Sequence, residues 1–269
     1  MELYWILSVY AFVFGASIAS FLNVVIWRVP RGESIVSPPS HCPKCNAAIR
    51  WYQNLPILSW LALRGRCASC HAPISPRYIL IETLGGVLFL GAFSWCFWMG
   101  APIWLVPVYW MWIALMIVGS FIDFDLQLLP DFVTVGGMAL GLLTASVESF
   151  LLRNFVPLAW SAGGLAFGFA LLWLVRFLGT KAFRREAMGM GDVFLMGAVG
   201  AMCGPLGALA TLILSSVFGS LVGLAVMAIS KTKLGSFVAI PYGPYICLGC
   251  LCWMFGSPWI VRWYFAVLT

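Results

Sequence analysis

Long apolar runs dominate the chain, and short polar stretches separate them. About 20 residues of α-helix cross the ~30 Å hydrocarbon core of a bilayer, so runs of that length predict membrane spans. We expect spans near residues 5–27, 78–99, 103–122, 132–151, 157–178, 191–208, 209–229 and 244–266. A CGPLG turn at 203–207 divides the sixth span, which is short, from the seventh. The pattern predicts an all-α polytopic membrane protein with about eight transmembrane helices.

The composition supports a lipid environment. Of the 269 residues, 62% are hydrophobic and 9% are charged, which is more apolar surface than a water-soluble core can hide. The net charge of +6 could suggest a nucleic-acid partner, but the charged residues lie between the apolar runs, as in oriented membrane proteins. The first apolar run is preceded by Glu2 and by no Lys or Arg, and it is too long for the apolar core of a signal peptide. We therefore expect a retained first span, membrane lipid around the chain and no nucleic acid.

The basic residues predict an orientation. With eight spans, 13 of the 15 Lys and Arg residues fall in three loops on one side of the membrane, and only Arg153 and Arg262 fall opposite. The 13 residues are Arg28, Arg31, Lys44, Arg50, Arg64, Arg66, Arg77, Arg176, Lys181, Arg184, Arg185, Lys231 and Lys233. The positive-inside rule makes that side cytoplasmic, with both termini facing outward.

Residues 28–77 form the only sizeable polar loop, between a first span over 1–27 and the remaining chain over 78–269. The loop carries two CxxC pairs with 21 residues between them, an interval slightly longer than usual. Their thiols belong to Cys42, Cys45, Cys67 and Cys70. Four thiolates suit a closed, structural Zn²⁺ site, and a metal would stabilise a segment too small for its own core. Two disulfides or four free thiols are the alternatives, and a cytoplasmic position disfavours the disulfides.

Other potential ligands are not expected to join this site. His41 and His71 directly adjoin the cysteines, and adjacent residues rarely bind one ion. Five further cysteines lie in apolar runs, where we expect them to pack as small apolar side chains. They are Cys96, Cys203, Cys247, Cys250 and Cys252.

Two acidic stretches lie at the predicted membrane edge: FIDFDLQLLPD at 121–131 and EAMGMGD at 186–192. An ionisable group at membrane depth is expensive and therefore indicates function. The predicted topology places Asp123 and Asp192 on the same face at similar depth. Two carboxylates that converge in a partly dry site do not both ionise easily, so one can activate water while the other polarises a carbonyl. The sequence thus indicates acid–base chemistry of the aspartic protease kind.

These motifs resemble those of the type IV prepilin peptidases, a family of membrane aspartic proteases. In that family an aspartate is followed after six residues by Pro-Asp or Pro-Asn, and a later GxGD closes on a second aspartate. The segment SFLNVVIWRVP before a loop with paired CxxC motifs resembles the bacterial members, so the similarity covers nearly the whole chain. It implies a peptidase domain over 78–269, with two catalytic residues and four supporting ones. The catalytic pair is Asp123 and Asp192, and the supporting residues are Pro130, Asp131, Gly189 and Gly191.

The resemblance also implies an activity and a location. Such enzymes of the bacterial inner membrane remove a short basic leader, usually ending in Gly, from prepilins or type II secretion pseudopilins on the cytoplasmic side. They also methylate the new amino terminus, usually Phe, with S-adenosylmethionine. No Gly-rich cofactor fingerprint occurs in residues 28–77, so no residue is assigned to the methyl donor. The sequence does not predict an oligomeric state.

Three alternatives remain. A protease of the signal-peptide-peptidase kind typically has Tyr before its first aspartate, where this chain has Ile122. An ion or metal transporter would place its acids near mid-bilayer in broken helices, whereas these acids lie at span ends. A structural subunit of a secretion apparatus would use the acids only as helix caps and would lack proteolysis.

The remaining acids have simpler interpretations. Asp125 is two residues from Asp123 and so lies on another helix face, where we expect a solvated or auxiliary acid. Asp131 begins the next span and is expected to cap it. Glu82, one turn into the second span, either pairs with a basic group and orients the site or snorkels to the surface. Glu186 is expected to form a surface ion pair.

Overall fold

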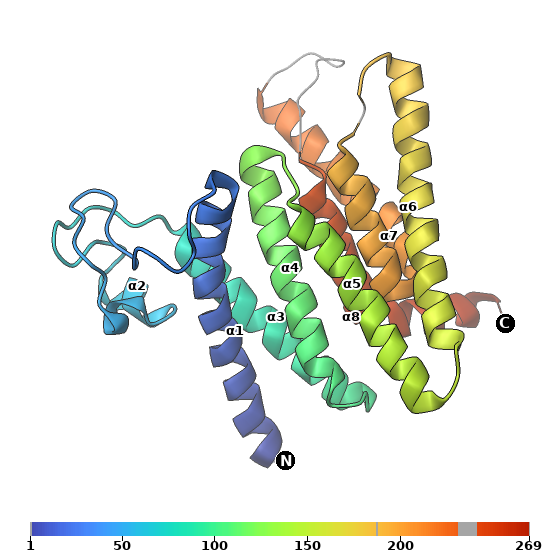
Figure 1. Cartoon of the computed structure of the whole chain (residues 1–269), viewed down its shortest axis with the longest axis horizontal. Helices are drawn as coiled ribbons and strands as arrows, with labels where there is room; N and C mark the ends of the chain where they lie inside the picture. Colours follow the sequence, from blue (N-terminus) through green and yellow to red (C-terminus); the bar gives the residue numbers. More distant parts are fainter. Residues whose placement is uncertain (1, 187, 231–240, 269) are drawn as a thin grey trace. The chain divides into compact units, whose positions relative to one another are not determined.

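The computed structural model describes residues 2–186, 188–230 and 241–268. The long helices are α1 (Glu2–Arg28), α3 (Arg77–Met99), α4 (Leu105–Leu126), α5 (Asp131–Leu152), α6 (Val156–Phe183), α7 (Met190–Ser230) and α8 (Gly243–Leu268) (Figure 1). The polar loop contains η1 (Val29–Arg31), η2 (Trp51–Asn54) and α2 (Leu58–Ala62), and its extended pairing is limited to two isolated bridges in the described residues. The all-helical fold class is confirmed. Lys231 and Lys233, which contributed to the predicted orientation, lie outside the described residues.

Six of the described helices, α1 and α3 to α7, are long and apolar enough to cross a bilayer, so the protein is a multi-pass membrane protein. The predicted count of about eight spans is not confirmed. Two of the predicted spans, 191–208 and 209–229, lie within α7, which is 41 residues long.

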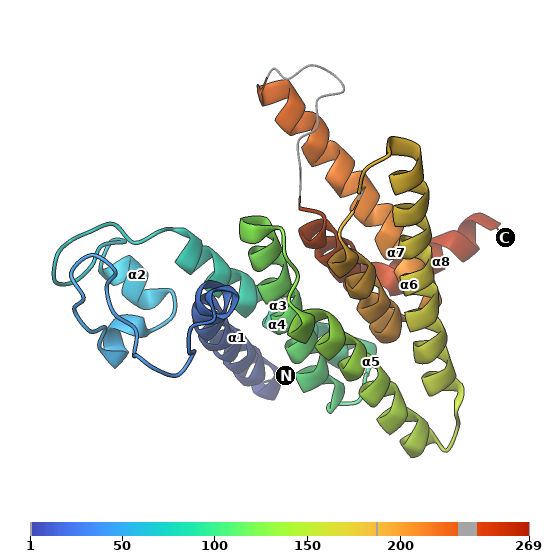
Figure 2. The same ribbon diagram turned by 45° about the horizontal axis from the view of Figure 1, so that its top comes forward.

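Helix α7 contains a sharp kink within the predicted CGPLG turn. Gly204 has φ 73° and ψ −179°, a conformation open essentially only to glycine, and Pro205 follows with no N–H to donate. Figure 2 shows α7 changing direction sharply along its length. The 14 residues before Gly204 form ~21 Å of helix, which is shorter than the ~30 Å hydrocarbon core. Because this first segment of α7 is shorter than the hydrocarbon core, the apolar run at 191–208 does not by itself establish a separate membrane span.

The chain forms two compact units, Met1–Val118 and Gly119–Thr269. In the first unit, α1 packs on α3, and Gly15 leaves room for the Phe89 side chain. Close packing at small residues is the usual way in which membrane helices associate. Trp110 of α4 stacks on Phe89 at a ring-centroid distance of 5.3 Å, and its Nε1–H donates to the Phe89 carbonyl at 2.9 Å. These contacts join α1, α3 and the first half of α4.

In the second unit, α7 contacts α5, α6 and α8. The α6–α7 crossing is tight because Gly164 and Gly200 bring the two backbones into direct contact. Ser161 reinforces this crossing by donating to the Ala201 carbonyl at 2.7 Å. The crossing fixes the first segment of α7, and the end of α4 and the start of α8 lie in the same unit.

Candidate active site and metal centre

Asp123 lies in the last turn of α4 and is only 5% exposed. The helix ends at Leu126 because Gln127 adopts the left-handed conformation, with φ 52°, while its N–H donates to the Asp123 carbonyl at 2.8 Å. Asp125, two residues further on, is exposed. The two acids therefore lie on different faces of α4, in agreement with the expectation from their spacing.

The Asp123 carboxylate contacts the first residue of α8. The backbone N–H of Gly243 donates to Asp123 Oδ2 at 2.9 Å, and both groups are buried. A Cβ at position 243 would lie 2.8 Å from Oδ2 and 3.2 Å from Cγ of Asp123. Only glycine therefore lets the start of α8 approach this closely. Sequence reasoning missed Gly243, although its place in Pro-Tyr-Gly-Pro at the start of an apolar run was a visible signal.

Asp192 lies in the first turn of α7 and is partly exposed. The backbone N–H of Gly189 donates to its carboxylate. A Cβ at Gly191 would lie 2.9 Å from the Leu129 side chain, so the GxGD segment packs against the Leu-Pro-Asp segment of the first motif. Asp192 is near enough to Asp123 for their charges to interact, and the buried Cys247 thiol lies within the same range of both carboxylates. The structure thus brings the two predicted aspartates together.

The neighbouring acid at the start of α5 differs slightly from expectation. Asp131 was expected to cap this helix, but the cap position is taken by Pro130, which makes no side-chain capping bond. Pro130 is extended, with φ −65° and ψ 145°, as a residue before a helix normally is. Asp131 is exposed in the first turn, where the positive end of the helix dipole favours a carboxylate. Its interaction with the helix is therefore electrostatic.

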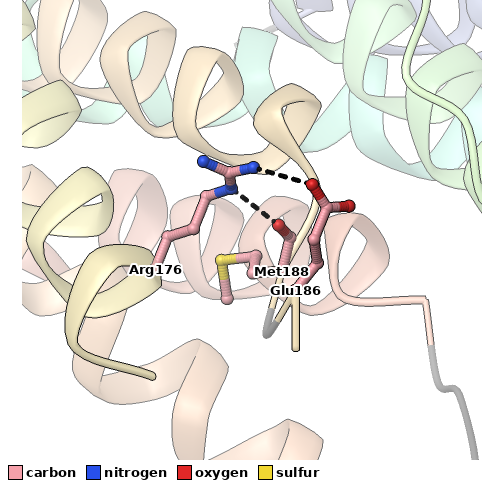
Figure 3. A network of polar contacts seen from close by, with 3 residues as sticks. All are labelled: Arg176, Glu186 and Met188. Carbon is pink, nitrogen blue, oxygen red and sulfur yellow. Dashed lines mark hydrogen bonds and ion pairs between the residues drawn. The ribbon is translucent and has the colours of Figure 1, made fainter. Parts of the chain in front are cut away.

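Arg176 of α6 holds the segment that precedes Asp192 (Figure 3). Its Nε–H donates to the Met188 carbonyl at 2.9 Å, and a terminal guanidinium nitrogen lies 3.4 Å from Glu186 Oε1. The Glu186 side chain is 83% exposed, so the predicted surface ion pair is confirmed, with Arg176 as its partner. The hydrogen bond to the Met188 carbonyl fixes the backbone to α6 at the residue before Gly189. Arg176 therefore helps to set the start of the GxGD segment.

The four predicted cysteines of the polar loop form one cluster. Their Sγ atoms all lie within 4.8 Å of one another, with Cys42···Cys70 at 3.8 Å and Cys45···Cys67 at 4.0 Å. A tetrahedral zinc with Zn–S of ~2.3 Å requires sulfur separations of about 3.8 Å. All four cysteines are free thiols, so the two-disulfide alternative is not adopted. The donor set fits a closed zinc site composed only of cysteines, as expected.

Each CxxC pair has the same local structure. The N–H of Cys42 donates to Ala47 and that of Cys67 to Ala72, at 3.0 and 2.8 Å, and each pair is followed by a residue in the left-handed conformation. Backbone N–H groups of the turn, first that of Cys45, lower the pKa of the Cys42 thiol, and those led by Cys70 lower the pKa of Cys67. The first cysteine of each pair therefore favours the thiolate that a metal binds. Although the Ala47 N–H lowers the pKa of Cys45, the three neighbouring thiols raise it to about 11, because they stand close to it.

Glu82 neither snorkels nor reaches the surface, because it is only 7% exposed. Its Oε2 accepts a hydrogen bond from the Ile57 N–H at 2.7 Å. Ile57 precedes α2 and has φ 64° and ψ −52°, an unfavourable conformation for a β-branched residue. Glu82 thus fixes a strained turn of the polar loop to α3.

Comparison with known proteins places these features in a family. The model of the bacterial peptidase A24 N-terminal domain matches residues 13–97, and that of the type IV leader peptidase family matches residues 110–224. A prepilin leader peptidase/N-methyltransferase of Legionella pneumophila is 34% identical, over 97% of this chain and 95% of its own length. One from Myxococcus xanthus is 40% identical over 82% of this chain, which spans 63% of that relative. A type 4 prepilin-like proteins leader peptide-processing enzyme of Escherichia coli is 36% identical, over 90% and 91%. No solved structure matches the chain.

Proposed function

Because this chain belongs to the type IV leader peptidase family, we propose that Asp123 and Asp192 are its catalytic pair. The protein is an enzyme that processes prepilins and N-methylates them, the two activities named for its relatives. The observation that carries the assignment is the convergence of the two carboxylates from α4 and α7, next to the Gly243 N–H. The proposed organisation is a first span over 1–27, a loop domain with the four-cysteine zinc site over 28–77 and a peptidase domain over 78–269.

The chemistry follows from two carboxylates that share one proton. The ionised aspartate takes a proton from water, whose oxygen attacks the carbonyl carbon of the scissile peptide bond. The protonated aspartate donates to the carbonyl oxygen, giving a tetrahedral intermediate. The intermediate collapses when the aspartate that took the proton from water gives it to the peptide nitrogen, which leaves as the amine, while the other aspartate takes a hydroxyl proton and the product carboxyl group forms. The Gly243 N–H keeps the Asp123 carboxylate in one orientation throughout these steps.

The substrate enters from the cytoplasmic side in this proposal. The basic residues of the polar loop and of the end of α6 support that orientation through the positive-inside rule. The substrate is a prepilin or pseudopilin of the bacterial inner membrane, with its basic leader in the cytoplasm and its apolar helix in lipid. Asp123 and Asp192 lie at helix ends, which suits cleavage at the membrane boundary.

Two bound groups are proposed. Cys42, Cys45, Cys67 and Cys70 would hold one Zn²⁺, and four protein ligands leave no open position, so the ion would stabilise the loop and not activate water. S-adenosylmethionine would supply the methyl group in the second activity. The part of the chain that the structure describes has no Gly-rich strand-to-helix turn, and no residue is assigned to the methyl donor.

Cleavage of a purified prepilin in detergent tests the aspartate pair. We expect the wild-type protein to release the leader and Asp123→Asn and Asp192→Asn to release none. Asp125→Asn is the matched control, because this exposed acid lies on another face of α4. If both pair variants still cleave, the catalytic assignment is wrong. If the wild type cleaves none of several prepilins, the peptidase proposal itself fails.

A further inference from the structure

A cavity of ≈300 Å³ lies between the second segment of α7 and the start of α8. Its lining residues are Ser216, Gly219 and Ser220 of α7, Tyr242 directly before α8 and Tyr245 in the first turn of α8. The Tyr242 hydroxyl is hydrogen-bonded to Ser215 Oγ at 2.8 Å and lies 3.3 Å from Ser216 Oγ. The hydroxyl is thus already engaged, so the Tyr242 ring is the part available to a ligand.

A residue that lines this cavity is next in the chain to the residue that binds Asp123. Tyr242 directly precedes Gly243, whose N–H binds Asp123. Consecutive Cα atoms are ~3.8 Å apart, which is also the spacing between neighbouring residues of a bound peptide. One wall of the cavity, Tyr242, is therefore a single residue along the chain from the N–H that positions Asp123.

We propose that this cavity is the subsite for the substrate residue that follows the scissile bond, and that it accepts an aromatic or large apolar side chain. The inference rests on the proposed peptidase function. The cavity is at the small end of ligand pockets, which suits a single side chain and not a length of peptide. Two tyrosine rings suit an aromatic side chain, because ring pairs favour offset or edge-to-face contact. In the proposed substrate the leader is basic and the segment after the bond is an apolar helix, so a cavity with two tyrosine rings suits the residue after the bond.

Gly219 is the position from which an added side chain would enter the cavity. A Cβ at this position would lie 3.6 Å from Tyr245 Cδ2 and 3.7 Å from Tyr242 Cε2, which is ordinary contact. A larger side chain at 219 would therefore begin between the two rings without meeting backbone. Gly163 of α6 is the matched control, because a Cβ there meets no atom within 4 Å.

The test compares Gly219→Leu and Gly163→Leu on two prepilins that differ only after the scissile bond, with Phe in one and Ala in the other. We expect Gly219→Leu to lower kcat/KM for the Phe substrate by roughly 10–100-fold, the range for a filled side-chain pocket. We expect kcat/KM for the Ala substrate to stay within about threefold, and Gly163→Leu to match the wild type on both. An equal loss on both substrates, or no loss on either, would overturn the subsite. Failure of the wild type on both would instead refute the peptidase function.

A binding measurement decides the matter if Gly219→Leu does not fold. The Asp192→Asn protein is mixed with a prepilin that carries a benzophenone side chain after the scissile bond, and the mixture is irradiated. We expect crosslinked peptides that contain residues 216–220 or 242–245. Crosslinks to other segments, or none to these two, would contradict the assignment.

Discussion

Replacing Gly243 by alanine tests whether the start of α8 positions the Asp123 carboxylate. The new Cβ would lie 2.8 Å from Oδ2, about 0.6 Å closer than the 3.4 Å at which ordinary contact begins. Since the conflict is with the short Asp123 side chain, the carboxylate or the helix start must move by a comparable distance. A displacement approaching 1 Å at a reacting group costs about 10²-fold in rate. We therefore expect kcat/KM to fall by about 10²-fold, or roughly 2.7 kcal/mol.

The assay is cleavage of a purified prepilin in detergent, with kcat and KM measured separately. Gly163→Ala is the control, because its added methyl group meets nothing within 4 Å. A thermal melt of each variant separates misplacement of the carboxylate from loss of the fold. If Gly243→Ala retains kcat/KM within about twofold of the wild type, the positioning argument fails. A rise in KM alone would indicate a contribution to substrate binding and not to the chemical step.

Three further outcomes are expected. The purified protein should contain one zinc per chain by atomic emission, and Cys67→Ser should lose it; a metal-free wild type would refute the site. Glu82→Ala should speed limited proteolysis of the polar loop, because it removes the hydrogen bond from the part-buried Ile57 N–H, worth ~0.5–1.5 kcal/mol, whereas Glu82→Gln keeps an acceptor and should resist like the wild type. Arg176→Met should lower kcat/KM by about tenfold through a looser start of α7, whereas Glu186→Gln should have little effect because its ion pair is exposed; equal effects would contradict this reasoning.

Much of this architecture could be predicted because it depends on local patterns. Apolar runs set the helices, and the CxxC turns place their own thiols close together, so spacing alone indicates the metal site. Asp123 and Asp192 were identifiable because each sits at a helix end within a short motif. The division at 203–207 could also be predicted from the sequence. How deeply each segment of α7 enters the bilayer could not.

The remaining contacts depend on tertiary structure. Gly243 is 120 residues from Asp123, and no periodicity links the end of one helix to the start of another. The hydrogen bond from Arg176 to the Met188 carbonyl could not be predicted from the sequence either, because every residue has a backbone carbonyl. The sequence left open whether Glu82 pairs with a basic group or reaches the surface, because its actual partner, the Ile57 N–H, depends on where that turn lies. Such backbone partners can be found only once the chain is folded.

The short first segment of α7 has a consequence for the surrounding lipid. At ~21 Å this segment is shorter than a hydrocarbon layer of ~30 Å, so its two ends, at Asp192 and at Gly204, both reach a membrane surface only where the bilayer thins around it. Thinning brings the headgroup region, and with it water, toward the end of the segment that carries Asp192. Bilayer thickness thereby becomes a determinant of hydration at the aspartate pair, set by where Gly204 interrupts the helix.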